Sequence, residues 1–323
     1  MTITLPAKPT LEEFIQTCTP LAIIEPLEES IRLRVADITA ALLRFKYDTS
    51  ENAENNLIRF LRADENFLGI ILALSNLSQE KFLRILSAER FAKGDFSSEW
   101  GINAIHAKLR NEPEFAERIA KLFLDGRNSP LLVNHIAGFY LDDLSLPEDW
   151  PMSIVDTKII QKLIRRKLGG EYTDKKGDAV EGIIRYELDV ILSKYGLGHE
   201  KGQVQRGIDK EIDHAIPSLT DPYVMIMTSY METTSSNQTT RANEQSEMFG
   251  IVQRENRRYN TKRVFVNFVD GAGWLARRSD LRKLHAGCDY IINLNTLDQL
   301  EAIICKVVPE SYFTKLPRPE VQG

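Results

Sequence analysis

The sequence predicts an α/β domain, with a mixed sheet flanked by helices, that follows an N-terminal all-α domain. From Leu11 to about Tyr140, apolar residues recur at spacings of three and four, as amphipathic helices require. Beyond about residue 150, apolar runs typical of strands alternate with helical segments. We therefore expect a helical domain over residues 1–150 and an α/β domain over residues 151–323.

The composition indicates an ordinary globular protein. The chain has 323 residues, of which 43% are hydrophobic and 27% are charged, and its formal net charge is -5. It has no apolar run long enough for a membrane span and no pattern of a secretion signal at its start, so we expect a cytoplasmic protein. The three cysteines are widely spaced and form no CxxC motif, which argues against a structural zinc site.

The helical half shows no repeat of fixed length and no motif that assigns it a role. Residues 142–153, "DDLSLPEDWPMS", contain two prolines and several acidic residues. Proline cannot continue a helix, so this segment is the best candidate for a linker. It places the domain boundary near residue 150.

A cationic helix is predicted directly after this linker. The segment "TKIIQKLIRRKLGG" has isoleucine and leucine on one side and lysine and arginine around the other, and Gly169 and Gly170 are expected to end it. Such a surface is either an ordinary solvated face or a contact for phosphate groups. The residues expected to contact phosphate groups are Lys162, Arg165, Arg166 and Lys167, extended by Lys175 and Lys176.

A second helix and four strands follow. The segment "GDAVEGIIRYELDVILSKYG" has a buried apolar stripe with Glu181 beside it. A helical pattern between two of the apolar runs favours a crossover connection, so part of the sheet is expected to be parallel. The predicted strands cover residues 210–217, 223–231, 263–270 and 289–295.

Two carboxylates and a polar turn are the candidate site. Glu181 on a helix and Asp213 on the following strand can gather as oxygen ligands of a divalent cation at one sheet edge. Glu181 can instead simply stabilise the helix dipole. The turn "TTSSNQTT" contains Asn237 and Gln238, which are of the type that contacts adenine with two hydrogen bonds, although such a turn is often an ordinary loop or helix cap.

Taken together, "KKGDAVEG", "IDHAIP", "TTSSNQTTRANE" and "VNFVDGAGWLARRSDL" followed by "DYIINLNTL" resemble type II restriction endonucleases of the PD-(D/E)XK superfamily. The tail resembles in particular the family that cuts GATC. The resemblance covers roughly residues 155 to 305 and implies a restriction-endonuclease-like sheet, a Mg²⁺ site and hydrolysis of double-stranded DNA. It also implies that Asp213 is the metal-binding aspartate of the strand and Glu181 the carboxylate of the preceding helix.

The chain departs from this superfamily at the (D/E)-x-K pair. The two positions look like Met227 and Ser229, which offer neither a hard oxygen ligand nor a positive charge. Three explanations compete: Glu232 is a relocated ligand, the register is shifted, or fewer ligands suffice. Arg241 and Lys210 are candidates for the missing lysine. The expected catalytic set is Asp213, Glu181, Glu232 and Ser229, with DNA contacts from Asn237, Gln238 and Arg241.

The sequence-based hypothesis is thus a site-specific endonuclease that acts on double-stranded DNA with Mg²⁺. A noncatalytic DNA-binding or structural protein with a decayed nuclease site is the alternative, and a helical interaction module is the third. Because both strands of a duplex must be cut and one chain builds one site, we expect a homodimer with two-fold symmetry.

Overall fold

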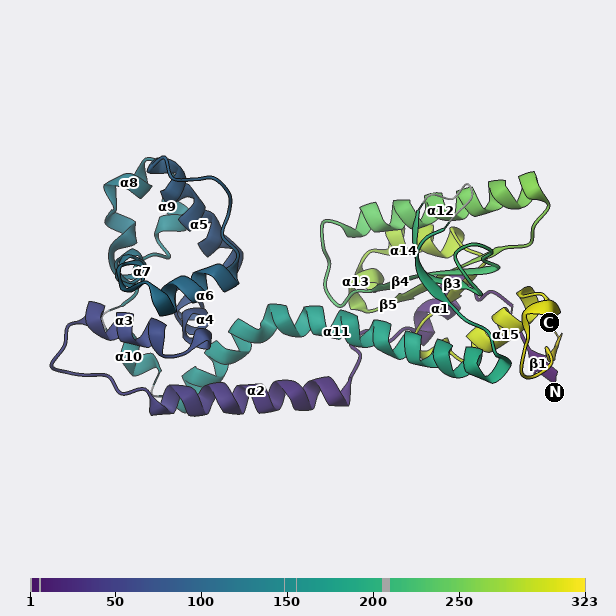
Figure 1. The fold of residues 1–323 in the computed structure, drawn as a ribbon, viewed down its shortest axis with the longest axis horizontal. Coiled ribbons are helices and arrows are strands. Elements are labelled where there is room, and N and C mark those ends of the chain that lie inside the picture. Colours follow the sequence, from purple (N-terminus) through teal and green to yellow (C-terminus); the bar gives the residue numbers. More distant parts are fainter. Residues whose placement is uncertain (1, 6, 148, 155, 205–209, 323) are drawn as a thin grey trace. The chain divides into compact units, whose positions relative to one another are not determined.

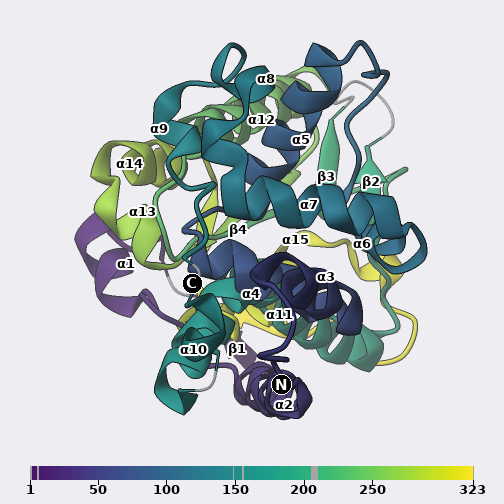
Figure 2. The same cartoon turned by 90° about the vertical axis from the view of Figure 1, so that its left-hand side faces the viewer.

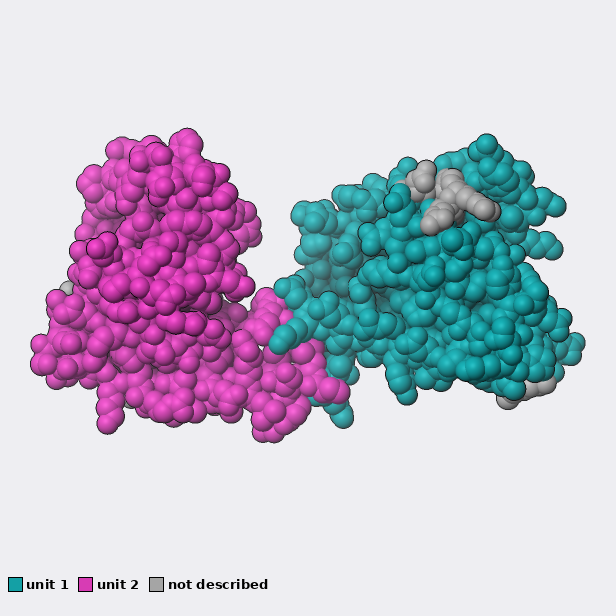
Figure 3. Space-filling view, viewed as in Figure 1, with its two compact units in different colours: residues 1–25, 173–323 teal, residues 26–172 magenta. Residues whose placement is uncertain are grey.

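The chain forms two compact units, coloured separately in Figure 3. The computed structural model describes residues 2–5, 7–147, 149–154, 156–204 and 210–322. Unit 1 comprises Met1–Glu25 and Thr173–Gly323, and unit 2 comprises Pro26–Tyr172. This division differs from the predicted boundary near residue 150. The first 25 residues pack with the C-terminal part of the chain, and the second boundary falls after Tyr172, within α11 (Thr157–Tyr195). Glu148 of the predicted linker lies outside the described residues.

Unit 2 is all helical, as predicted for this part of the chain. Its apolar side chains form one core, in which Phe60, Phe67, Phe82, Phe123 and Trp150 are fully buried. Helices α3, α4, α6 and α7 pack together within it (Figure 2). The helices are α2 (Glu25–Arg44), α3 (Ala53–Ala63), α4 (Glu65–Leu74), α5 (Gln79–Ala92), α6 (Ile102–Asn111), α7 (Pro113–Asp125), α8 (Pro130–Val133), α9 (Gly138–Leu141) and α10 (Trp150–Ser153), with a 3-10 turn, η1 (Gly126–Asn128).

Side-chain caps explain where several of these helices begin. Asn52 accepts a hydrogen bond from the backbone N–H of Asn55 at the start of α3, at 2.7 Å. Asp64 caps α4 and Ser78 caps α5 in the same way. These caps satisfy N–H groups that have no partner inside the helix.

Helix α11 (Thr157–Tyr195) is continuous over 39 residues. The predicted end at Gly169 and Gly170 is therefore wrong. Each glycine lowers helix stability by only about 1 kcal/mol, and buried stripes on both sides of the pair offset that cost. Ile160, Ile164 and Leu168 are buried in the core of unit 2, and Val180, Ile184 and Leu188 in unit 1. No helix in the described part of the chain is both long and apolar enough to cross a membrane.

Unit 1 is built on a five-stranded mixed sheet, which agrees with the predicted α/β class (Figure 1). The strands are β2 (Glu200–Gln203), β3 (Glu211–Ile216), β4 (Val224–Tyr230), β5 (Val264–Asp270) and β6 (Tyr290–Ile292), in that order. The pairs β2–β3 and β3–β4 are antiparallel, whereas β4–β5 and β5–β6 are parallel. Helix α12 (Gln238–Tyr259) forms the predicted crossover between β4 and β5.

Helices cover both faces of this sheet. Helix α11 and α15 (Gln299–Val307) pack on one face. Helix α12 and α14 (Arg278–Ala286) pack on the other face, together with α1 (Leu11–Thr17). Short α13 (Ala272–Ala276) follows β5, and turns η2 (Leu294–Thr296) and η3 (Glu310–Tyr312) flank α15. Strand β1 (Thr2–Thr4) pairs in parallel with β7 (Glu320–Gln322), so the two ends of the chain meet.

Asp270 fixes the N-terminal segment to the sheet. Its carboxylate is fully buried and accepts hydrogen bonds from the backbone N–H groups of Thr19 at 2.6 Å, Gly271 at 2.8 Å and Leu294 at 3.1 Å. Burial raises the pKa of Asp270, and the three N–H donors oppose this shift. One side chain thus joins β5, the turn after β6 and the segment after α1.

We expect Asp270→Ala to lower the free energy of unfolding of unit 1 by about 2–4 kcal/mol, because three buried N–H groups lose their acceptor. Hydrogen exchange followed by mass spectrometry should show faster exchange around Thr19 and Leu294, with unit 2 unchanged. The matched control is Asp298→Ala, since Asp298 is exposed and makes no capping hydrogen bond. Equal exchange in the two variants would contradict the anchoring role of Asp270.

Candidate functional site

Asp213 lies where strands β3 and β4 separate. The paired register ends at His214 opposite Ile226. At the next position of β3, the Asp213 side chain forms the hydrogen bonds to β4. Its Oδ2 accepts one from the backbone N–H of Thr228 at 2.8 Å and one from the Thr228 hydroxyl at 3.0 Å. The Asp213 side chain is 25% exposed, and the Nζ of Lys201 on β2 lies 3.7 Å from Oδ1. One carboxylate oxygen is therefore held by β4 while the other faces a cation.

Glu181 is exposed on α11, beside the stripe that packs on the sheet. Polar contacts of α11 are found on both sides of Glu181 along the helix. Lys176 forms an ion pair with Glu232, just after the end of β4. Farther along α11, exposed Asp189 contacts His199, which contacts His214 on β3. Glu181 lies between these two contacts in the sequence.

Glu181 and Arg185 lie one turn apart on α11, and positions four residues apart share one face of a helix. The charge of Arg185 contributes to lowering the pKa of His214, the residue that follows Asp213 on β3.

A pair of carboxylates suits Mg²⁺, which binds through one or two protein carboxylates and keeps several waters. Oδ1 of Asp213 and the exposed side chain of Glu181 are hard oxygen donors of this type. Within the described residues, no group of three or more His, Cys, Asp or Glu could hold a metal ion. A metal site here would therefore depend on water and substrate oxygens as further ligands.

Met227 and Ser229 face away from α11. Side chains alternate along a strand, and Thr228 with Tyr230 lie on the face that packs with α11. Met227 packs in the core beneath α12, and Ser229 is 1% exposed with no hydrogen-bond partner for its hydroxyl in the described structure. This burial corrects the expected catalytic role of Ser229, because a phosphodiester cannot reach the hydroxyl.

Lys176 and Glu232 form a buried ion pair at the end of β4. Lys176 is 4% exposed, and the Glu232 side chain is 14% exposed. Oε1 of Glu232 also accepts a hydrogen bond from the Tyr230 hydroxyl at 2.7 Å, and that hydroxyl accepts one from the N–H of Ala22 at 3.0 Å. Burial and the bond to Glu232 raise the pKa of Tyr230. The expected phosphate contact of Lys176 is thus corrected, because its ammonium group is turned toward Glu232.

The structure divides the predicted DNA contacts between the two units. On the part of α11 in unit 2, Lys162, Arg165 and Arg166 are exposed. Arg166 bonds to the Asn76 side chain and to the carbonyl of Ala73, so it also holds α4. Lys167 is half-buried, and this burial lowers its pKa. Of these four cationic residues, Lys162 and Arg165 therefore fit the predicted cationic surface best, because both are exposed.

In unit 1, the polar turn before α12 is only partly accessible. Asn237 and Arg241 are exposed, and Lys175 on α11 is half-buried. Gln238 is fully buried, and its Oε1 accepts a hydrogen bond from the N–H of Ser235 at 3.1 Å. The expected base contact by Gln238 is therefore corrected, because this side chain shapes the turn. Lys210, a candidate for the missing lysine, forms an ion pair with Glu247 at 2.7 Å.

Sequence reasoning missed a pair of histidines beside Asp213. The Nδ1 atoms of His214 and His199 lie 3.1 Å apart, and Nε2 of His199 lies 3.0 Å from Oδ1 of Asp189. Burial lowers the pKa of His214 to about 4, so its ring is neutral near neutral pH. No local pattern signals this pair, because β2 and β3 bring together residues from different segments.

Comparison with known families gives one result. Residues 158–302 match the model of the DpnII restriction endonuclease family. The matched segment is less than half of the chain, and most of the helical unit lies outside it. No curated protein and no solved structure matches the chain. The match supports a type II restriction endonuclease and includes Asp213, Glu181, Lys176 and Glu232.

Proposed function

We propose that the protein is a sequence-specific endonuclease of the PD-(D/E)XK superfamily that hydrolyses phosphodiester bonds of double-stranded DNA with Mg²⁺. One observation carries this proposal: the family match coincides with the sheet on which Asp213 lies at a strand separation, with one oxygen held by Thr228. The Asp213 side chain is 25% exposed at this position, so its Oδ1 is accessible to a ligand.

Asp213 and Glu181 are the proposed ligands of the ion. Bound there, Mg²⁺ would lower the pKa of a water molecule and neutralise charge on the phosphate in the transition state. The two hydrogen bonds from Thr228 orient the Asp213 carboxylate. Lys201 lies near Oδ1 and would move to a phosphate oxygen when Oδ1 binds the ion.

Glu232 is the proposed replacement for the carboxylate that is missing at Met227. Its contacts to Lys176 and Tyr230 both use Oε1, so Oε2 is the oxygen that can turn toward a ligand. Lys176 is a positioning residue in this scheme, because it is buried and acts through Glu232. The pair restores a carboxylate and a cation on the α11 face of the sheet.

A decayed site is the second candidate function, and the placement of Met227 and Ser229 beneath α12 favours it. Such a protein would retain DNA binding without cleavage. Incubation of the wild-type protein with mixed plasmid and phage DNA in Mg²⁺ distinguishes the two candidates. Discrete fragments support the endonuclease, whereas binding without cutting in Mg²⁺ or Mn²⁺ supports the decayed site.

We expect Asp213→Ala to abolish cleavage and to leave DNA binding intact or tighter, because the change removes a negative charge that repels phosphate. Cleavage is followed on supercoiled plasmid, and binding by anisotropy of a labelled duplex. Asp189→Ala is the matched control, since Asp189 is an exposed aspartate on the other side of the histidine pair. Cleavage at the wild-type rate by Asp213→Ala would remove this residue from the mechanism.

We expect Lys176→Met to weaken Mn²⁺ binding and to lower kcat by about 10–100-fold, with KM little changed, because Glu232 loses the group that positions it. Lys176→Arg should restore much of both. The matched control is Lys194→Met, because Lys194 also lies on α11 and pairs with a glutamate, Glu301. Equal losses of Mn²⁺ affinity in Lys176→Met and Lys194→Met would show that the effect is structural.

The proposed active form is a homodimer with two-fold symmetry, because each chain offers one site and a duplex has two strands. Sedimentation equilibrium should therefore show a dimer with a duplex that carries the target site. A strict monomer with and without this duplex, which still makes double-strand breaks in one encounter, would contradict this arrangement.

A further inference from the structure

Unit 2 contains a cationic cavity to which the proposed nuclease site assigns no role. It has a volume of about 490 Å³ and lies between the end of α2 and the helices α3 and α4. Its charged lining residues are Arg44, Lys46 and Arg59, with Asp64 as the single acid among the described residues that line it, and Phe45 and Phe67 form an aromatic wall. Cavities of this size commonly hold small ligands or part of a larger one.

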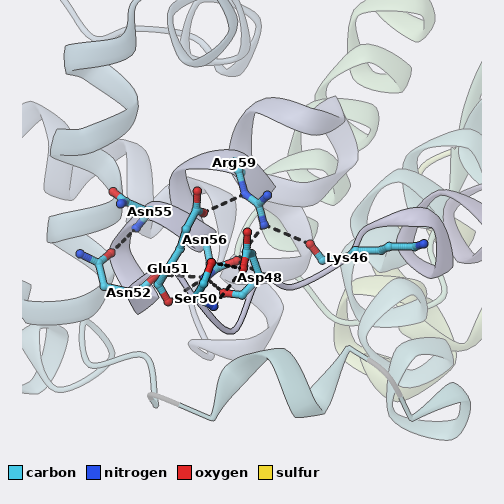
Figure 4. Close-up of polar contacts among 8 residues, drawn as sticks. All are labelled: Lys46, Asp48, Ser50, Glu51, Asn52, Asn55, Asn56 and Arg59. Atoms are coloured by element: carbon cyan, nitrogen blue, oxygen red, sulfur yellow. Dashed lines mark hydrogen bonds and ion pairs between the residues drawn. The ribbon is translucent and has the colours of Figure 1, made fainter.

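The loop that carries Lys46 is held in place by Asn56, which is fully buried (Figure 4). Oδ1 of Asn56 accepts a hydrogen bond from the N–H of Asp48 at 2.9 Å, and its Nδ2 donates to the carbonyls of Asp48 at 2.8 Å and Asn52 at 3.1 Å. Asp48 in turn accepts from the N–H of Ser50 at 2.9 Å. The loop is therefore preorganised, which lowers the entropy cost of binding.

Arg59 is oriented by the same network. Its Nη2 donates to Oδ1 of Asn56 at 2.9 Å and to the carbonyl of Lys46 at 3.1 Å, and its Nε lies 3.2 Å from Oε2 of Glu51 (Figure 4). Its guanidinium carbon lies 5.8 Å from the centre of the Phe45 ring. The guanidinium is thus fixed at the cavity wall.

Asp64, the acid that lines the cavity, already accepts hydrogen bonds within unit 2. Oδ1 of Asp64 accepts hydrogen bonds at 2.8 Å from both the backbone N–H and the side-chain amide of Asn66 at the start of α4. Arg44 and Lys46 are exposed. Because Glu51 pairs with Arg59, the excess of positive charge that the cavity presents comes from Arg44 and Lys46.

A second cavity in unit 2 has the same volume, about 490 Å³, but a different charge balance. There Glu54, Glu89 and Asp125 face Arg118 and Lys121. Its charges largely cancel, so it offers no comparable attraction to an anion. Of these two cavities, only the one lined by Arg44, Lys46 and Arg59 has more cationic than anionic side chains.

We propose that the cavity of Arg44, Lys46 and Arg59 is a phosphate-binding site. Arginine offers a planar fork of N–H donors that fits phosphate oxygens, and lysine adds a mobile point charge. The phosphate comes from the DNA backbone or from a free nucleotide. The DNA source rests on the proposed function, whereas the chemistry of the cavity does not.

The test uses the full chain in EDTA, so that cleavage plays no part. Binding of a labelled duplex is measured by anisotropy over a range of NaCl concentrations, and binding of dAMP and inorganic phosphate by calorimetry. The variant is Arg44→Gln with Lys46→Gln. The matched control is Lys121→Gln with Arg127→Gln, which removes the same charge from side chains that are 65% and 58% exposed in the same unit.

For DNA, we expect the cavity variant to bind on the order of tenfold more weakly at low salt, and its log–log salt slope to fall by about 0.9 for each phosphate that the variant no longer neutralises. The control should retain the wild-type slope. Loss of dAMP or phosphate binding with unchanged DNA binding would support the same site with a free nucleotide as its ligand.

Two outcomes would overturn the proposal. One is unchanged binding of DNA, dAMP and phosphate in the cavity variant, which would leave Arg44 and Lys46 as charges that offset the dipole of α2. The other is an equal loss in the control, which would assign the effect to net charge. Failure of the nuclease proposal is distinguished separately, because it appears as absence of Mg²⁺-dependent cleavage by the wild-type protein.

Discussion

Unit 1 depends on the buried carboxylate of Asp270. It lies at the end of β5, and its bonds to Thr19 and Leu294 fasten the N-terminal segment across the carboxyl ends of the parallel strands. That edge is where open α/β sheets usually bind ligands. Residues after α1 lie at this edge here. Asp213 lies elsewhere on the sheet, where the antiparallel pair β3–β4 separates.

Side chains alternate between the two faces of β4, and this alternation decides which of its residues can contact a metal ion or a substrate. Thr228 and Tyr230 lie on the α11 face and make polar contacts with Asp213 and Glu232. Met227 and Ser229 lie beneath α12, in an apolar environment. A carboxylate or a lysine at either of these two positions would require desolvation of a charge, which is costly without a partner. Polar function on this strand therefore belongs to one face only.

Local patterns predicted the secondary structure well, because strands and crossover helices are set by short-range periodicity. The four predicted strands and α12 are found close to their expected ranges. Contacts between distant segments could not be predicted. The pairing of Lys176 with Glu232, the contact of His199 with His214, and the burial of Gln238 all depend on how elements pack. The continuity of α11 through Gly169 and Gly170 has the same origin, because burial on either side outweighs local propensity.

The pairing of β1 with β7 has a consequence for how the chain folds during synthesis. Unit 2 consists of one uninterrupted stretch, so it can fold while the ribosome is still making the rest. Unit 1 needs its first 25 residues and its last strand together, with the whole of unit 2 between them. The free-energy cost of closing a loop rises by only about 0.6 kcal/mol for each doubling of the loop length. Strand β1 therefore stays unpaired until β7 has been synthesised, so the two-stranded sheet of β1 and β7 forms later than the strands of the separate five-stranded sheet that carries Asp213.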